Sequence, residues 1–260
     1  MNWDAYFKMD EEKPLDHLVD GYSHTSIFQT IGFIGDSLLS GEFESRDAQG
    51  NPEYHDYYEY SWGAYIGRKN GITARIFSRG GMTAKEYMES FADANRFWDP
   101  AKACQAYVIA LGCNDLLNRK QDVGAIADIC AEDHRKNKDT FLGYYGAIIA
   151  RLKEIQPRAK FFLVTLPNQG PDDVNSELRK AHQKAMYDLA ENYDSTYVID
   201  LYQYGPVYDE SFRKRFWLYG HMNASGYIFT AQLVDSYLDY IVRKNPEEFH
   251  MVPYIGTDLH

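Results

Sequence analysis

The sequence predicts an α/β fold in which helices cover both faces of a parallel sheet. Five apolar runs of six or seven residues, rich in β-branched and aromatic side chains, recur along the 260-residue chain. Longer segments between them carry apolar residues at helical spacing. Strands that alternate with helices are typical of a parallel sheet, whose strands are buried on both faces.

The predicted strands are spaced along most of the chain. They are TIGFIG (30–35), TARIFS (73–78), AYVIAL (106–111), KFFLVTL (160–166) and TYVIDL (196–201). Apolar stripes with a period near 3.6 residues predict the helices at 57–69, 140–155, 175–192 and 224–243. Pro157 ends the second of these helices.

The organisation of the chain predicts one domain over residues 1–260. No low-complexity tract, repeat or Gly/Ser linker divides it, so we expect a core over about 28–243. Residues 244–260 follow the last predicted helix and are expected to form an arm. That arm lies over the domain or over a second subunit, which leaves a homo-oligomer open.

The charge and the apolar runs narrow the classes of partner. A net charge of -11 argues against a protein that binds nucleic acid or anionic lipid. The N-terminus lacks the apolar run of a secretory signal, and every apolar run is far shorter than the roughly 20 residues that span a membrane. We therefore expect a cytoplasmic protein. The three cysteines show no Cys-x-x-Cys spacing, which disfavours disulfides and a zinc site.

The residues that follow the predicted strands carry the chemistry. In an open parallel sheet, ligands bind beyond the carboxyl ends of the strands. Those positions hold Ser37, the glycines of SRGGMT (78–83), the asparagine of GCND (112–115) and, later, the histidine of YGHMNASGY (219–227). A serine, a histidine and donors for an oxyanion are the parts that serine acyl transfer requires. Ser37 could also cap the helix that follows it.

Four sequence blocks resemble the SGNH or GDSL hydrolases, in the order of that family's motifs. They are GDSLLSGE, the glycine of RGGMT, GCND and GHMNASGY. The resemblance implies a three-layer α/β/α flavodoxin-like sandwich, here with a five-stranded parallel sheet, and an esterase or acylhydrolase activity. By this match Ser37 is the nucleophile and His221 the base. The N–H groups of Ser37 and Gly81 and the amide of Asn114 form the oxyanion hole, so no metal or other cofactor is needed.

One family position departs from the pattern. The family places an aspartate three residues before the catalytic histidine, and this chain has Leu218 there. Losing that acid costs roughly 10⁴-fold in rate in a serine protease. A main-chain carbonyl could orient His221 in its place, giving a Ser-His dyad. The carboxylates of Asp209, Glu210 and Asp200 are the other candidates.

Aromatic residues close in sequence to His221 indicate the substrate class. Tyr208, Trp217 and Tyr219 are predicted to line the substrate pocket, since their flat faces and polar edges suit a sugar. We therefore expect a small-molecule ester substrate, an acetylated carbohydrate in the favoured case. Two alternatives stay open: a catalytically weakened relative that only binds ligands, motivated by Leu218, and an acyltransferase that uses the same dyad.

Overall fold

A parallel sheet forms the centre of the molecule, whose computed structural model describes residues 11–259. Its strand order is β4-β1-β5-β6-β7. Counting only these five strands along the chain, the order is 2-1-3-4-5, as in flavodoxin-like folds. The strands are β1 (Thr30–Gly35), β4 (Thr73–Ser78), β5 (Ala106–Ala110), β6 (Lys160–Val164) and β7 (Thr196–Ile199). The predicted strands are confirmed, the last three ending one or two residues earlier than expected.

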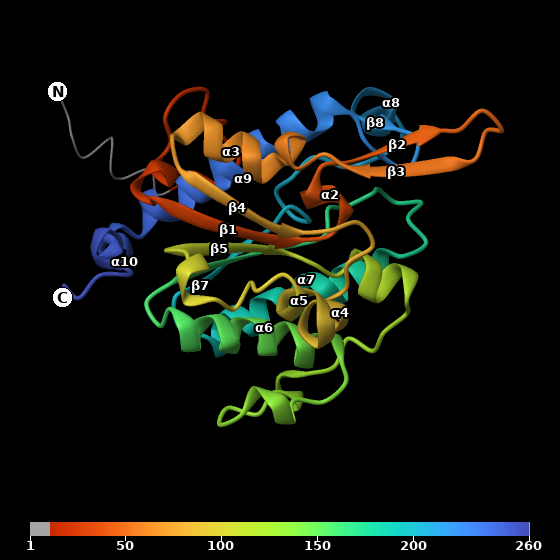
Figure 1. Ribbon diagram of the computed structural model, residues 1–260. Coiled ribbons are helices and arrows are strands. Elements are labelled where there is room, and N and C mark those ends of the chain that lie inside the picture. Colours follow the sequence, from red (N-terminus) through yellow and green to blue (C-terminus); the bar gives the residue numbers. More distant parts are fainter. Residues whose placement is uncertain (1–10, 260) are drawn as a thin grey trace.

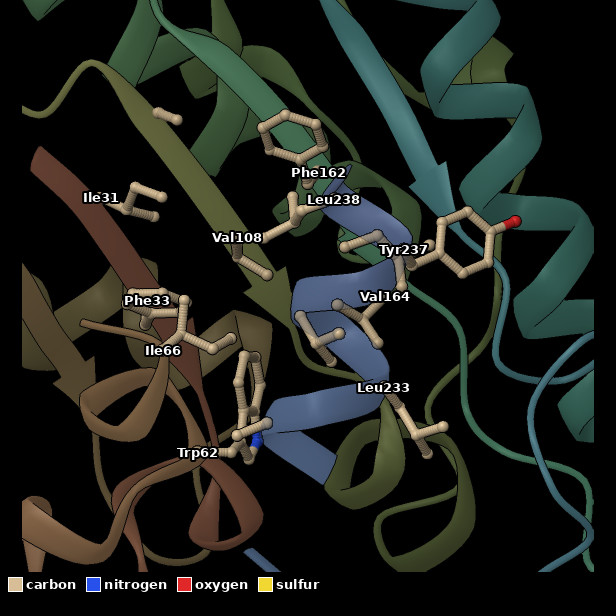
Figure 2. Packing of buried hydrophobic residues seen from close by; sticks show 14 of the residues in the cluster. Ile31, Phe33, Trp62, Ile66, Val108, Phe162, Val164, Leu233, Tyr237 and Leu238 are labelled. Atoms are coloured by element: carbon tan, nitrogen blue, oxygen red, sulfur yellow. The ribbon is translucent and has the colours of Figure 1, made fainter. Parts of the chain in front are cut away.

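Helices cover both faces of this sheet (Figure 1). On one face lie α3 (Trp62–Asn70) and α9 (Ala224–Lys244), and on the other α6 (Phe141–Ile155) and α7 (Ser176–Asn192). Each face buries its own apolar cluster. Figure 2 shows the first cluster, in which Trp62 and Ile66 of α3 and Leu238 of α9 meet side chains of the sheet. The predicted three-layer α/β/α arrangement is confirmed.

Shorter elements connect these layers. The short helices are α2 (Ser37–Ser40), α4 (Ala84–Glu86), α5 (Ala92–Ala94), α8 (Glu210–Phe216) and α10 (Pro246–Phe249). Two hairpins stand apart from the main sheet: β2 (Glu42–Arg46) with β3 (Pro52–Asp56), and β8 (Trp217–Leu218) with β9 (His221–Met222). Single 3₁₀ or π turns occupy His24–Ile27, Tyr58–Tyr60, Tyr87–Phe91, Pro100–Lys102, Cys113–Asn118, Ile126–Asp128, His134–Lys136 and Val252–Tyr254.

The β2–β3 hairpin is the main element that sequence patterning did not predict. It extends beyond the end of β1 that is followed by α2 (Figure 1). Its first strand packs against β9, and α2 also contacts β9. The hairpin therefore joins the first sequence block to the last. The helix expected at 57–69 begins later, at Trp62, because Ser61 caps it by accepting a hydrogen bond from the N–H of Gly63.

The C-terminal segment packs on its own chain. Phe249, Val252 and Ile255 are buried, and the Gln105 side chain donates a hydrogen bond to the Val252 carbonyl. Gln105 directly precedes β5, so the segment covers the amino ends of the strands, opposite the edge where the sequence blocks lie. Residue 260 of the predicted arm lies outside the described residues.

Replacing Gly32 by alanine should destabilise the sheet that positions the first block. A Cβ at Gly32 would lie 2.6 Å from Cδ1 of Tyr107, a ring that is buried and whose hydroxyl accepts a hydrogen bond from the Cys104 N–H. Overpacking of this kind costs about 1–3 kcal/mol. Urea unfolding measures the loss.

Gly21→Ala is the matched control for that substitution. A Cβ at Gly21 meets no atom within 4 Å, so the free energy of unfolding should change by less than about 0.5 kcal/mol. Equal stability of the Gly32→Ala variant and the control would contradict the packing argument.

Candidate active site

Ser37 lies in the turn that follows β1, as the first residue of α2. The helix is capped by its neighbour Asp36, whose Oδ1 accepts a hydrogen bond from the Leu38 N–H at 3.1 Å. Gly41 ends the helix with a φ of 75°, a conformation that glycine adopts without steric cost. Because Asp36 supplies the cap, the half-buried Ser37 side chain is not needed for that role.

Asn114 ties three loops together. Its Nδ2 donates to the Met82 carbonyl at 3.1 Å and, at 3.4 Å, to Oδ2 of Asp36. Asp115 adds a second link, since its Oδ1 accepts a hydrogen bond from the Ala84 N–H at 2.7 Å. The structure thus brings the first, second and third sequence blocks together at the carboxyl ends of β1, β4 and β5.

The two glycines of the second block differ in their surroundings. The Gly80 N–H donates to Oδ2 of Asp56 at 3.3 Å, and a Cβ at Gly80 would collide with Oε2 of Glu42. Gly81 has a φ of 72°, and a side chain there would meet open space. Gly80 is therefore committed to the β2–β3 hairpin, while the space beside the Cα of Gly81 is open.

His221 begins β9, in a hairpin whose turn is Tyr219 and Gly220. Tyr219 has a φ of 56°, which is uncommon for a residue other than glycine. His221 pairs with Leu218 across the hairpin, and Leu218 is 44% exposed. The position where the family carries an aspartate therefore holds a partly exposed leucine on the neighbouring strand.

Two glutamates of β2 contact the His221 ring. Oε1 of Glu42 lies 2.8 Å from Nε2, and Oε2 of Glu44 lies 3.6 Å from Nδ1. Residues two apart on a strand share a face, so both carboxylates point the same way. Burial lowers the pKa of His221, but the hydrogen bond between Nε2 and Glu42 and the charges of both glutamates outweigh it and leave the pKa raised.

Sequence reasoning missed these two acids. The available signal was the alternation Glu42-Phe43-Glu44, followed by the turn-rich stretch DAQGNP, which is typical of a hairpin strand. The strand buries its glutamates, both less than a tenth exposed, and a search for apolar periodicity overlooks such a strand.

The acids proposed for the missing triad position have other partners. Asp209 caps α8 through a 2.8 Å hydrogen bond from the Phe212 N–H, and the exposed Glu210 pairs with Lys214. Asp200 is fully buried and accepts hydrogen bonds from three side chains, those of Thr165, Gln183 and Tyr187. Among the described residues, the ion-pair partners of His221 are Glu42 and Glu44 alone.

The three predicted pocket aromatics lie in different surroundings. Tyr208 is buried and stacks on Phe212, with ring centroids 4.0 Å apart. The Trp217 ring lies under the Arg213 guanidinium. Tyr219 is 57% exposed, and the Arg46 guanidinium lies over its ring.

Tyr54, on β3, was not predicted as a site residue. It is 56% exposed, and its ring meets the His221 imidazole edge to face at 5.6 Å. Tyr54 and Tyr219 are therefore the exposed rings beside His221.

A small apolar cavity of about 60 Å³ lies next to the candidate site. Its walls include the neighbours of both predicted catalytic residues: Asp36 and Leu38 flank Ser37, and Met222 follows His221. Tyr208 also lines it. Burial raises the pKa of Asp36 to about 7.

The described residues contain neither a cluster suited to a metal ion nor a membrane-spanning helix. Within residues 11–259, no group of three or more histidine, cysteine or acidic side chains is arranged to hold a metal ion. In the same part of the chain, no helix combines the length and the apolar character needed to cross a membrane.

Solved structures with a similar fold include carbohydrate esterases. The family two carbohydrate esterase from Clostridium thermocellum in complex with cellohexaose is 17% identical, with a TM-score of 0.56 over 91% of this chain and 66% of the other. A family 2 carbohydrate esterase from Corynascus thermopiles (Myceliophthora fergusii) is 13% identical, with a TM-score of 0.54 over 88% and 69%.

A protein of the G-D-S-L lipolytic family from Desulfitobacterium hafniense is 18% identical, with a TM-score of 0.50 over 80% of this chain and 99% of the other. Because these three structures are less than 25% identical to the chain, the comparison establishes a similar fold and nothing further. No curated protein sequence matches the chain.

A family model adds evidence from the sequence itself. The model of the GDSL-like lipase/acylhydrolase family matches residues 33–228, a range that includes Ser37, Gly81, Asn114 and His221. Because the match spans well over half of the sequence, the chain belongs to the GDSL-like lipase/acylhydrolase family, whose members hydrolyse ester bonds.

Proposed function

We propose that the protein is a serine esterase that removes a small acyl group from a carbohydrate. The observation that carries this proposal is the convergence of four loops. Asn114 links the loops that hold Ser37 and Gly81, and the α2 helix that starts at Ser37 packs against the β9 strand that starts at His221. The residues that we propose as nucleophile, base and oxyanion donors thereby lie at one edge of the sheet, which supports the proposal.

The proposed reaction proceeds in two acyl-transfer steps. Ser37 Oγ attacks the ester carbonyl carbon while His221 Nε2 accepts the hydroxyl proton. The resulting oxyanion accepts hydrogen bonds from the N–H groups of Ser37 and Gly81 and from Nδ2 of Asn114, which releases its 3.4 Å hydrogen bond to Asp36 to make this contact. The C–O bond to the leaving alcohol then breaks, and His221 returns the proton to that alcohol. Water repeats the sequence on the acyl-serine and releases the acid and free Ser37.

Two features of the site support a short acyl group on a sugar. Ligand pockets for larger molecules commonly measure about 300–1,000 Å³. A cavity of about 60 Å³ suits an acetyl group better than a long chain. The exposed ring of Tyr54, and the face of Tyr219 that Arg46 does not cover, offer flat surfaces on which a sugar can stack. Carbohydrate esterases among the structural neighbours, one in complex with cellohexaose, agree with this substrate class.

A fluorophosphonate probe should label the purified protein at Ser37, because only an activated serine attacks such a reagent. Ser37→Ala should abolish the labelling and reduce hydrolysis of p-nitrophenyl acetate to the background rate. Mass spectrometry of the labelled peptide and the colorimetric assay measure the two effects. A wild-type protein that neither reacts with the probe nor outpaces the Ser37→Ala variant would instead support a ligand-binding relative.

Removing the exposed rings should affect sugar esters selectively. Tyr54→Ala and Tyr219→Ala should each raise KM for an acetylated cello-oligosaccharide by about fivefold, since stacking on an aromatic ring is worth about 1 kcal/mol. Hydrolysis of p-nitrophenyl acetate, which has no sugar, should keep its KM within about twofold. Tyr22→Ala is the control, because Tyr22 is 82% exposed and lies outside the site. Equal effects on both substrates would argue against a sugar platform.

Substituting Asp209 should lower stability and spare catalysis. Asp209→Ala removes the cap of α8 and should cost about 1 kcal/mol in thermal or urea unfolding. Asp209→Asn retains a capping side chain and should unfold like wild type. Both variants should keep kcat/KM within about tenfold, because Asp209 is committed to α8. A loss near 10⁴-fold in either would identify Asp209 as the acid that serves His221.

A further inference from the structure

Both nitrogens of the His221 ring face carboxylates that the family pattern does not include. We propose that β2 supplies the acid that Leu218 lacks: Glu44 positions the imidazole through Nδ1, and Glu42 competes with Ser37 for Nε2. The inference rests on the proposed function, in which His221 Nε2 accepts the Ser37 proton. Glu44 is thus a positioning residue, and Glu42 is a side chain that must leave Nε2 before the reaction begins.

Glu44 is held in the manner expected of a triad acid. Its Oε1 pairs with the Arg46 guanidinium at 2.6 Å, and its Oε2 accepts a hydrogen bond from the Gly220 N–H at 2.8 Å. Gly220 directly precedes His221, so the acid is bound to the same turn as the ring that it serves. Only 6% of the Glu44 side chain is exposed. These contacts fix the carboxylate on the Nδ1 side of the ring.

The Nδ1 atom itself still lacks a hydrogen bond. It is buried and has no hydrogen-bond partner among the described residues, and Oε2 of Glu44 is the carboxylate atom that faces it, at 3.6 Å. Catalytic hydrogen bonds are often long in the absence of substrate and shorten in the complex. A movement of less than about 1 Å would bring Glu44 into hydrogen-bond range of Nδ1.

Glu42 forms an ion pair with Nε2, the nitrogen of His221 that must accept the Ser37 proton. Its Oε1 lies 2.8 Å from Nε2, and the other oxygen lies against the Cα of Gly80. Within the described part of the chain, His221 is the only ion-pair partner of Glu42. Nε2 cannot accept a proton from Ser37 while it donates one to Glu42. The Glu42 carboxylate must therefore move when the Ser37 hydroxyl engages His221.

The protonation state of His221 decides whether Nε2 stays bound to Glu42 or is free to accept the proton of Ser37. An imidazolium donates from both nitrogens and satisfies both glutamates. A neutral ring with its proton on Nδ1 faces Glu44 and presents a lone pair to Glu42, which is repelled. Other groups also act on this pair: the acids Asp36 and Asp56, the guanidinium of Arg46, and the phenols of Tyr54 and Tyr227.

The direction of the pH effect follows. The carboxylates favour the imidazolium and so raise the pKa of His221. Neutral His221, which can accept the Ser37 proton, forms only as the pH rises through that raised pKa. Removing the Glu42 charge lowers the pKa of His221 and moves the onset of activity to lower pH, because Glu44 still orients the ring.

The isosteric variants Glu42→Gln and Glu44→Gln separate the two roles in a pH–rate profile with p-nitrophenyl acetate. For Glu42→Gln, the rising limb should move to lower pH while the kcat plateau stays within about threefold of wild type. For Glu44→Gln, kcat should fall at every pH, and its plateau should be at least about 100-fold lower than in wild type. Neutralising the acid of a serine protease triad likewise lowers kcat. Glu53→Gln, an exposed glutamate of β3 in the same hairpin, is the control and should change neither quantity.

Two outcomes would overturn the assignment. A full plateau in Glu44→Gln would remove Glu44 as the positioning residue. A plateau loss in Glu42→Gln as large as that in Glu44→Gln would show that Glu42 does not compete with Ser37. Thermal unfolding of each variant separates a loss of fold from a loss of catalysis.

An NMR titration of the His221 ring supplies a test that needs no activity. The pKa of His221, read from its Cε1–H resonance, should fall in Glu42→Gln and in Glu44→Gln relative to wild type, and Glu53→Gln should leave it unchanged. If wild type fails to hydrolyse esters, the proposed function fails while this titration still tests the contacts with the ring. An unchanged pKa in both glutamine variants would reject the carboxylate pair.

Discussion

The arrangement of the site depends on the buried carboxylate of Asp36. One oxygen caps α2, and the other accepts a hydrogen bond from Asn114. These contacts set the direction in which the chain leaves β1 and hold the third block against the first. Burial favours the protonated form of Asp36, while the hydrogen bond from the Leu38 N–H favours the carboxylate. The effect of burial is the larger, so the pKa of Asp36 is raised. Asp36 thus links the start of α2, which carries Ser37, to the side chain proposed to complete the oxyanion hole.

Sheet topology determines which loops can reach this carboxylate. β1 lies between β4 and β5, so the loops that follow these three strands emerge side by side. They carry Ser37, Gly81 and Asn114. Asp200 follows β7, which lies at the far edge of the sheet beyond β6. The carboxyl ends of parallel strands share one edge, but that edge is several strands wide, and neighbouring strands lie about 4.8 Å apart. Asp200 consequently belongs to a network around α7.

The parts of the structure that could be predicted are those in which sequence pattern and burial agree. Strands buried on both faces produce apolar runs, and long helices such as α6 and α9 produce stripes, so the layers were predictable from the sequence. The positions of Ser37 and Asn114 could be predicted because each follows a predicted strand, and ligands of an open parallel sheet bind beyond the carboxyl ends of its strands. The β2–β3 hairpin could not be predicted, because its buried residues include Glu42 and Glu44. The contacts that bury these glutamates come from Gly220 and His221, which lie far along the chain. Asp209 is close to His221 in sequence, but its carboxylate caps α8.

The carboxylates around His221 act on the proposed reaction in opposite directions. They stabilise the imidazolium that forms when Ser37 loses its proton, which is the role of the acid in a triad. They also repel the negative oxygen of the tetrahedral intermediate, and a buried setting strengthens both effects because Coulomb energy scales inversely with the effective dielectric and the distance. Glu42 touches Nε2 and lies against Gly80, close to where an oxyanion bound by the neighbouring Gly81 N–H would sit. Glu44 lies on the far side of the ring and is partly neutralised by Arg46. Glu44 can therefore support the imidazolium at little cost to the oxyanion, whereas Glu42 must move away from both.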